Sequence, residues 1–495
     1  MRVLLINVCG QPQVRIPQGL LYLASALHTA GHEVIVHDEA FVTEPNESLE
    51  QIISCNADVI GLSVYTFPRQ LRRVEHLSQA IKTLRKVTPI VWGGWHATLY
   101  PAQSIANEYV DIVVRGPGEK PLCEILTALE KNQSLKHIPG LVLKEDTQIT
   151  DIEPECLDPE WLYPPLNFEL IRFNAYLKEH DRSAGTLQYI TTRGCNARCN
   201  FCLMSRVFQR HLIRKPSAQI LAELKYILHN YRITGIHFSD DNTFTNEREA
   251  LELCELVREA TGGKRIPWRC ATRINTLSGL SPEAYQKLVA AGCEGVVVGI
   301  ESGSDRVLRL MGKGITVAGT RKALKGLADS GLNRNLFFFL LNFTGETKSD
   351  ASKTVQLARE TRMMLPQSDI QLNVFFPGAS FDTLTPLNSA ASRHQPMSTV
   401  LEDYYEKHIR NYRVGRTHIK TLRYYLDAGV YKDHAGTVGI LAKTYRKLIR
   451  LRIRYGIFAL PFERCLSNTV VRKIRRCLLR TRVNTRQTER EGTTE

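Results

Sequence analysis

Two stretches of the chain alternate short apolar runs with helix-length amphipathic segments. The first stretch, residues 1–150, has apolar runs at 3–7, 32–38, 59–64, 90–92 and 112–115, with helical spacing at 19–30, 71–86 and 122–132. Such alternation predicts βαβ units and a parallel sheet covered by helices. A single core rarely grows past about 250–300 residues, so 495 residues indicate two or three domains.

The second stretch, residues 186–385, repeats the alternation six times. Strands are predicted at 189–192, 235–239, 267–272, 295–300, 336–341 and 370–375, with helices between them. Six βα steps predict a partial (βα)6 barrel of the TIM type, in which functional groups stand at the carboxyl ends of the strands. A proline-rich linker, 151–185, joins the two α/β domains, and a helical, basic region, 386–495, follows the barrel.

Three cysteines follow the first predicted barrel strand with the spacing C-x3-C-x2-C: Cys195, Cys199 and Cys202. Thiolates select zinc, copper(I) or iron–sulfur clusters. A structural zinc site has four protein ligands, and His211 is a candidate for the fourth. Three thiolates on a cubane cluster leave one iron open for another ligand, with Phe201 beside it. Zinc, an iron–sulfur cluster and three unrelated buried thiols all remain open at this point.

The cysteine spacing and Phe201 resemble the C-x3-C-x2-aromatic-C motif of the radical S-adenosylmethionine (SAM) enzymes. The resemblance implies a 4Fe–4S cluster on Cys195, Cys199 and Cys202. It also implies that SAM binds the fourth iron and is cleaved reductively to a 5′-deoxyadenosyl radical.

Polar residues end several of the other predicted barrel strands. Glu301 and Ser302 belong to a Gly-Ile-Glu-Ser-Gly-Ser stretch that resembles the fourth-strand motif of the family, which implies contacts to the SAM ribose and adenine. Asp240 and Asp241 stand where the family holds the SAM amino group, and Arg273 ends the next strand. For each of these residues the alternative is an ordinary strand-end or helix-capping charge.

The first domain resembles the cobalamin-binding domain that precedes the barrel in one radical SAM subgroup. The resembling pieces include Pro-Gln-Gly-Leu-Leu-Tyr at 17–22, a serine loop, a Gly-Gly-x-His-Ala loop and Arg-Gly-x-Gly-Glu at 115–119. The resemblance implies a Rossmann-like fold with cobalamin bound by Ser63, Thr66, Gly93, Gly94 and His96. No histidine follows the first strand, so cobalamin without a lower histidine ligand, or a fold that has lost the cofactor, is expected.

The net charge of +15 is concentrated near the C-terminal end of the sequence. Residues 440–490 hold fifteen Lys or Arg against two acids. A basic amphipathic helix there suits either peripheral contact with an anionic membrane or a solvated face; no recognition motif favours nucleic acid.

No apolar run reaches the roughly 18–20 residues of a membrane span. Singly scattered cysteines favour a reducing, cytoplasmic location.

Together these features predict a cobalamin-dependent radical SAM enzyme that methylates an unactivated carbon of a small or lipid-like metabolite. It would need an electron donor such as flavodoxin or ferredoxin. The alternative within enzymes is ring closure, ring contraction or oxidation without methyl transfer. An alternative of another class is a cobalamin sensor with a vestigial barrel, against which the three cysteines and Glu301 argue.

Overall fold

The computed structural model describes residues 1–8, 15–42, 45–65, 68–145, 148–155, 158–178 and 185–375. Thr66 and the predicted basic region 386–495 lie outside the described residues. Among the helices that are described, none is long and apolar enough to span a membrane.

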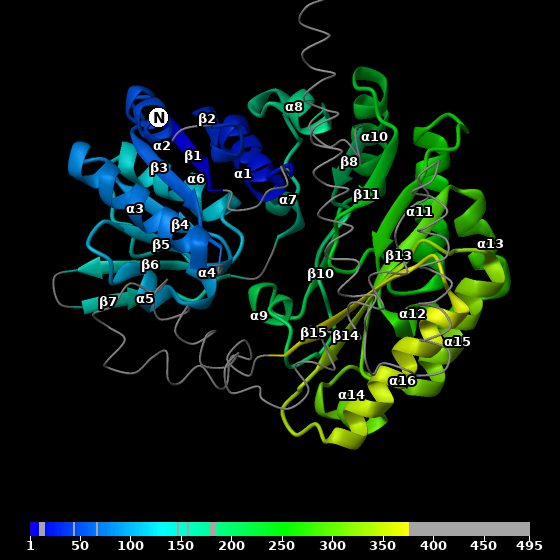
Figure 1. Cartoon of the computed structure of the whole chain (residues 1–495). Coiled ribbons are helices and arrows are strands. Elements are labelled where there is room, and N and C mark those ends of the chain that lie inside the picture. The colour runs from blue at the N-terminus through cyan, green and yellow to red at the C-terminus, as the bar shows by residue number, and fades with distance from the viewer. Residues whose placement is uncertain are drawn as a thin grey trace, which may run out of the picture. The chain divides into compact units, whose positions relative to one another are not determined.

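A seven-stranded sheet forms the first domain (Figure 1). The strands run in the order β2-β1-β3-β4-β5-β6-β7. The first five are parallel, whereas β6 and β7 pair antiparallel at one edge. Their bounds are β1 Arg2–Asn7, β2 Glu33–Asp38, β3 Val59–Ser63, β4 Ile90–Gly93, β5 Ile112–Val114, β6 Leu141–Glu145 and β7 Gln148–Asp151. The order reverses between β1 and β3, and ligands of such sheets bind beside the strand ends at that switch point.

Helices cover both faces of this sheet. Alternate residues of β1 enter two different cores, Leu4 and Ile6 on one face, Val3 and Leu5 on the other. A strand buried on both faces reads as a continuous apolar run, which explains why the sequence revealed it. The helices are α1 Gln18–Thr29, η1 Glu39–Phe41, α2 Pro45–Ser54, α3 Pro68–Leu84, α4 Trp95–Leu99, α5 Pro101–Ile105 and α6 Glu119–Glu130.

The second sheet has six parallel strands in the order β15-β14-β13-β12-β11-β8. They are β8 Thr186–Tyr189, β11 Gly235–Phe238, β12 Trp268–Ala271, β13 Cys293–Glu301, β14 Leu336–Leu341 and β15 Asp369–Val374. The order follows the chain, as in a barrel that does not close. The α/β fold class is therefore confirmed for both described domains.

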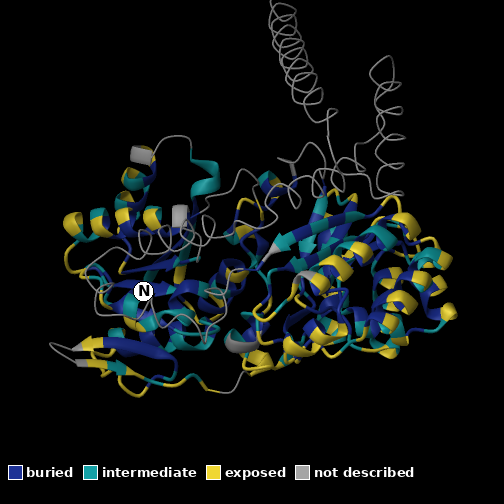
Figure 2. Cartoon of the chain, turned by 60° about the horizontal axis from the view of Figure 1, so that its bottom comes forward, coloured by how far each residue is buried: buried dark blue, intermediate teal, exposed yellow. Residues whose placement is uncertain are grey.

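The five longer barrel helices pack against one another in chain order, and their exposed sides line the outside of the domain (Figure 2). The barrel helices are α10 Ser217–Asn230, α11 Glu247–Ala260, α12 Ile274–Gly279, α13 Pro282–Ala290, α14 Asp305–Leu310, α15 Val317–Ser330 and α16 Lys348–Met364. Side-chain caps fix several of the starts: Asn246 caps α11, Thr316 caps α15, and Thr347 forms a capping box with Asp350 on α16.

One local prediction was wrong, and the linker holds more regular structure than its prolines indicate. The first barrel strand ends at Tyr189, and a separate antiparallel hairpin of β9 Thr192–Gly194 and β10 Leu212–Arg214 carries the cysteine loop. The proline-rich linker, whose composition disfavours helices and strands, contains α7 Pro159–Leu162, η2 Phe168–Leu170 and α8 Phe173–Lys178. Asp158 caps α7 and Asn167 caps η2, and Pro159 stands in the first turn of α7, where proline favours a helix start.

Candidate active site

The three cysteines share the loop between β9 and α9 (Met204–Val207). Cys199 is buried, while Cys195 and Cys202 are half-buried. The loop is tied to the end of α14 through Asn200, whose Nδ2 donates to the Leu310 carbonyl at 2.6 Å and whose backbone N–H donates to the Met311 carbonyl at 3.1 Å. The barrel therefore fixes the far end of the loop as well as its start.

Gly194, immediately before Cys195, has the left-handed φ of +79°. A Cβ there would stand 2.4 Å from the His211 carbonyl oxygen and 2.7 Å from Cβ of Phe208. Only glycine combines this φ with so close an approach. The tight pairing of β9 with β10 thus depends on Gly194, and the direction in which the chain enters the cysteine loop depends on that pairing.

Backbone amides point at the sulfurs. The N–H of Ala197 faces the Cys195 thiol and the N–H of Met204 faces the Cys202 thiol, and each lowers the pKa of its cysteine. Burial outweighs them: it raises the pKa of the Cys195 thiol, and it raises the pKa of the Cys202 thiol to about 11. The three thiols also interact with one another electrostatically. Amides directed at thiolate sulfurs tune iron–sulfur clusters, so the loop fits such a group.

Within the described ranges, no three His, Cys, Asp or Glu side chains are spaced to hold one metal ion. The thiolates of a cubane ligate three different irons and need not converge on a single point. His211 is exposed and directly precedes β10, and it belongs to no such group of described side chains.

Phe201 belongs to an apolar cluster beneath the cysteine loop. Its ring lies 6.2 Å from that of Phe343 in an edge-to-face arrangement, and the cluster also holds Val307, Met311 and Phe375. The Nζ of Lys313 stands 5.9 Å from the Phe201 ring centroid. The aromatic of the cysteine motif is therefore held in place by the second half of the barrel.

Glu301 ends β13 and is buried, with Oε1 accepting from Lys313 Nζ at 3.0 Å. Its φ is +67°, a left-handed conformation that is rare for a residue other than glycine. Asn342, at the end of the neighbouring strand, has φ +68°. Strained residues of this kind cluster at functional sites, so two of them on adjacent strand ends mark this edge of the barrel.

Lys313 was not singled out from the sequence. It follows α14 in a Met-Gly-Lys-Gly stretch, where a lysine between glycines reads as a surface loop. Yet Lys313 is only 7% exposed, and its backbone carbonyl oxygen accepts a hydrogen bond from Nη2 of Arg273. Lys313 therefore joins Phe201, Arg273 and Glu301, three residues that the sequence did single out.

The two aspartates after β11 have different surroundings. Asp240 is buried and accepts hydrogen bonds from the Thr191 N–H at 2.6 Å, the Thr191 hydroxyl at 2.7 Å and the Thr192 N–H at 2.9 Å. Asp241 accepts from the Gly194 N–H at 3.2 Å and faces a cavity, so water reaches it although protein surrounds it on most sides. Desolvation raises the pKa of Asp241 to about 6.

Asn242, the next residue, is fully buried, and neither polar atom of its carboxamide has a partner in the part of the chain that is described. Buried polar groups without partners are rare and call for an explanation such as an absent ligand. Ser302, by contrast, is satisfied internally: its hydroxyl lies 3.0 Å from Thr354 Oγ1 and accepts from the Ser304 N–H.

A second concave region opens at the carboxyl ends of the first sheet. It is a cavity of about 320 Å³. Six glycines line it: Gly19, Gly61, Gly93, Gly94, Gly116 and Gly118. Gly94 has φ +88°, and a Cβ there would meet the backbone of Val64 at 3.2 Å and Ser63 Oγ at 3.4 Å. Walls of bare backbone suit a large planar cofactor that must approach closely.

The opposite wall of this cavity comes from the barrel domain, through Thr192, Arg193, Met204, Ser239 and Asp241 among others. Ser63 lies on the wall with the glycines. His96 does not line the cavity: it is 1% exposed within α4, its ring centroid lies 5.1 Å from that of Tyr100 with the two rings tilted, and its backbone N–H donates to the Val64 carbonyl. Burial lowers the pKa of His96 to about 3, so the ring is neutral.

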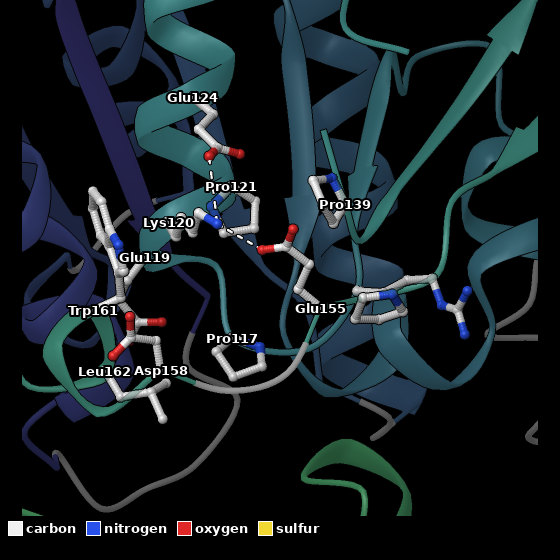
Figure 3. A pocket seen from close by; sticks show the side chains of 12 residues that line it. Pro117, Glu119, Lys120, Pro121, Glu124, Pro139, Glu155, Asp158, Trp161 and Leu162 are labelled. Atoms are coloured by element: carbon white, nitrogen blue, oxygen red, sulfur yellow. Dashed lines mark hydrogen bonds and ion pairs between the residues drawn. The ribbon is translucent and has the colours of Figure 1, made fainter. Parts of the chain in front are cut away.

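Another cavity, of about 190 Å³, lies between the start of α6 and the proline-rich segment (Figure 3). Lys120 spans it, paired with Glu155 at 2.6 Å and Glu124 at 3.8 Å. Of the residues that were singled out as cofactor ligands, none lines it. The candidate site is therefore the glycine-lined cavity together with the adjoining cysteine loop.

Two family models match the chain, the radical SAM superfamily over residues 189–358 and the B12 binding domain over residues 11–126. An uncharacterized methyltransferase of Pyrococcus horikoshii is 28% identical over 347 residues, 70% of this chain and 73% of that protein. The cytidylyl-2-hydroxyethylphosphonate methyltransferase of Streptomyces wedmorensis is 24% identical, covering 68% and 72%. The anaerobic magnesium-protoporphyrin IX monomethyl ester cyclase of Rubrivivax gelatinosus is 22% identical, covering 70% and 62%.

Solved structures share the fold. The radical SAM methyltransferase TsrM of Kitasatospora setae, with tryptophan and a SAM analogue bound, aligns with a TM-score of 0.64 at 21% identity, over 75% of this chain and 73% of that one. The cobalamin-dependent radical SAM enzyme OxsB, with aqua-cobalamin bound, aligns with a TM-score of 0.66 at 17% identity, over 95% and 75%.

Proposed function

Because the chain is a radical SAM protein with a B12-binding domain, we propose that it is a cobalamin-dependent C-methyltransferase acting on a small molecule. One observation carries this proposal. The glycine-lined cavity of the first domain has a wall made by β9 and α9, the two elements that flank the cysteine loop, so the two proposed cofactor sites would adjoin.

The residues present fit the cofactors that the two domains imply. Cys195, Cys199 and Cys202 would ligate a 4Fe–4S cluster, with amides directed at two of the sulfurs. The glycine cradle and Ser63 would hold cobalamin. When bound, these groups supply reductive cleavage of SAM and a transferable methyl group, while the protein binds and orients them.

Residues at the barrel edge would bind SAM. Glu301 presents a carboxylate anchored by Lys313, suited to accept hydrogen bonds from ribose hydroxyls. Asp241 and the unpartnered carboxamide of Asn242 stand beside the cysteine loop and suit a cationic amino group. Arg273 lies near Cys195, where a guanidinium favours a carboxylate.

The other partners of the reaction are also part of the proposal. Cluster reduction needs an electron donor such as flavodoxin or ferredoxin. The protein would act in the cytoplasm, and its basic segment 440–490 would be either a solvated face or a contact for an anionic membrane surface.

A second candidate is ring closure without methyl transfer, favoured by the likeness to the Rubrivivax cyclase. One experiment separates the two. The protein is reconstituted anaerobically with iron, sulfide and hydroxocobalamin, and then turned over with SAM, a reductant and candidate substrates. Methylation yields 5′-deoxyadenosine together with S-adenosylhomocysteine and a product heavier by one methyl. Formation of 5′-deoxyadenosine alone, with no methylated product, supports the second candidate and overturns the first.

A further inference from the structure

A buried ion pair links the two candidate cofactor sites. Glu119 begins α6 in the first domain, and its Oε1 accepts from Nη1 of Arg193 in β9 at 2.5 Å. The two side chains are 5% and 9% exposed. Both line the glycine-walled cavity, and Arg193 stands two residues before Cys195. One salt bridge thus connects the helix that walls the cobalamin cavity with the strand that leads into the cysteine loop.

Aromatic rings from two segments lie beside the guanidinium. Arg193 lies 4.2 Å from the ring centroid of Tyr22 in α1 and 5.6 Å from that of Tyr163, the residue after α7. The Tyr163 hydroxyl also donates to the Ile213 carbonyl in β10 at 2.7 Å. The first domain, the proline-rich segment and the cysteine hairpin therefore meet at one cation.

A second cation completes the arrangement. Lys215, just after β10, is fully buried and pairs with Glu223 of α10 at 2.6 Å. Its Nζ lies 5.1 Å from the Tyr22 ring centroid, 5.6 Å from that of Tyr163 and 4.4 Å from that of Tyr189. Each buried cation has its own carboxylate, but only the Arg193 pair crosses from one domain to the other.

Ion pairs buried this deeply are poor devices for stability, because desolvation offsets most of the attraction. Their best-attested use is to fix one register among several that an apolar contact would allow. The apolar cluster here consists of Tyr22, Leu162, Tyr163 and Ile213. The Tyr163–Ile213 hydrogen bond joins the proline-rich segment to the hairpin, whereas the Arg193–Glu119 ion pair joins the hairpin directly to the first domain. A charge at the start of α6 is thus bonded directly to β9, two residues before the first cysteine of the loop.

We propose that Glu119 and Arg193 are positioning residues that set the register of the cysteine loop against the cobalamin cavity. This inference rests on the proposed function, because the ion pair would fix the distance between the two proposed cofactor sites. The ion pair of Glu119 and Arg193, called the clamp below, is a property of the chain and can be tested without any catalytic turnover.

The test compares three variants of the full chain. Glu119→Gln combined with Arg193→Met removes both charges and leaves no buried ion unpaired. Glu124→Gln is the matched control, the same substitution on the same helix at a carboxylate whose partner, Lys120, lies at 3.8 Å near the surface. Tyr22→Leu removes the ring above Arg193 and keeps the ion pair, and so remains informative if the double variant does not fold.

Two measurements are made on each protein. Hydrogen–deuterium exchange compares peptides from β9 and the start of α6 with peptides from β3 and β13. Absorbance titration gives the dissociation constant for hydroxocobalamin. We expect the double variant to exchange at least tenfold faster at β9 and α6 alone, and to bind hydroxocobalamin at least tenfold more weakly. Tyr22→Leu should show a smaller change in the same peptides, and Glu124→Gln should match the parent.

Unchanged exchange at β9 and α6 in the double variant would overturn the clamp, as would an acceleration spread evenly over both sheets. If the double variant does not fold, unchanged exchange in Tyr22→Leu overturns it. A parent that binds no hydroxocobalamin while the selective change in exchange is seen would remove the proposed function and leave the clamp standing.

Discussion

Glu301 and Lys313 form a buried ion pair with an Oε1–Nζ distance of 3.0 Å at the carboxyl end of β13. Lys313 also faces the ring of Phe201. The acid proposed to bind SAM and the aromatic of the cysteine loop are therefore held by one lysine. Gly299 makes room for this pair, since a Cβ there would stand 2.0 Å from Glu301 Oε1 and 2.9 Å from Lys313 Nζ.

Replacing Lys313 with methionine should weaken SAM binding at least tenfold. The variant keeps the apolar stem but leaves the Glu301 carboxylate buried without its cation, so the side chain loses the orientation that the pair imposes. Equilibrium binding of SAM to the cluster-loaded protein measures the effect. Lys325→Met is the control, because Lys325 pairs with Asp329 on an exposed surface. Equal SAM affinity in the parent and Lys313→Met would contradict this role.

Replacing Gly194 with alanine should abolish cluster loading. The new Cβ would press on the His211 carbonyl oxygen at 2.4 Å, so β9 and β10 could not pair as they do. Gly331→Ala is the matched control: its φ is +80°, nearly that of Gly194, but no atom lies within 4 Å of the new Cβ. The control should lose only the left-handed penalty of about 1–2 kcal/mol and keep its iron. Iron per chain after reconstitution and thermal unfolding measure the two effects; full iron loading of Gly194→Ala would refute the argument.

The strands and the cysteine loop could be predicted from the sequence because their signals are local. A strand buried on both faces is an apolar run, and three thiols within eight residues are visible at once. The hairpin of β9 and β10 was missed because Thr-Arg-Gly has no strand-like pattern and is buried only through tertiary contacts. Glu119 and Arg193 are 74 residues apart, and no local pattern pairs them. Lys313 was missed for the same reason, since its burial comes from β13 and the cysteine loop.

Cys199→Ala should lower iron from about four per chain to below one and abolish SAM cleavage, because the cluster would lose one of three thiolates. Cys254→Ala is the control: this cysteine is buried in α11, outside the motif, and burial raises its pKa to about 12, so it behaves as an inert apolar side chain. Iron analysis and formation of 5′-deoxyadenosine measure both variants. Retained SAM cleavage in Cys199→Ala would exclude the cluster assignment.

The two neighbouring aspartates should separate stability from binding. Asp240→Asn places an amide against three donors from Thr191 and Thr192, so we expect a loss of about 2–3 kcal/mol in the free energy of unfolding. Asp241→Asn should unfold like the parent, because Asp241 makes one long bond and faces the cavity, but it should bind SAM more weakly. Urea unfolding measures the stability of each variant, and SAM titration measures its binding. A loss of stability in Asp241→Asn together with weaker SAM binding in Asp240→Asn would show that the roles are reversed.

The stability of the parent relative to Lys215→Met should rise with pH above about 8. Burial lowers the pKa of Lys215 to about 8, outweighing its pairing with Glu223, whereas an unfolded lysine titrates near 10.4. Between these values the unfolded chain binds more protons than the folded one, so the folding contribution of Lys215 improves as pH rises and is constant below pH 8. The gain from about pH 8 to about pH 9.5 is roughly 1–2 kcal/mol.

Urea unfolding of the parent and Lys215→Met at several pH values gives this difference. Taking the difference cancels the tyrosines nearby, which titrate in both proteins and whose pKa values are raised by burial in the fold. Lys225→Met, which removes an exposed partner of Glu259, should show no such slope. If the difference in the free energy of unfolding between the parent and Lys215→Met stays constant or falls over this pH range, Lys215 keeps an ordinary pKa. Water would then reach its ammonium group between the tyrosine rings around it.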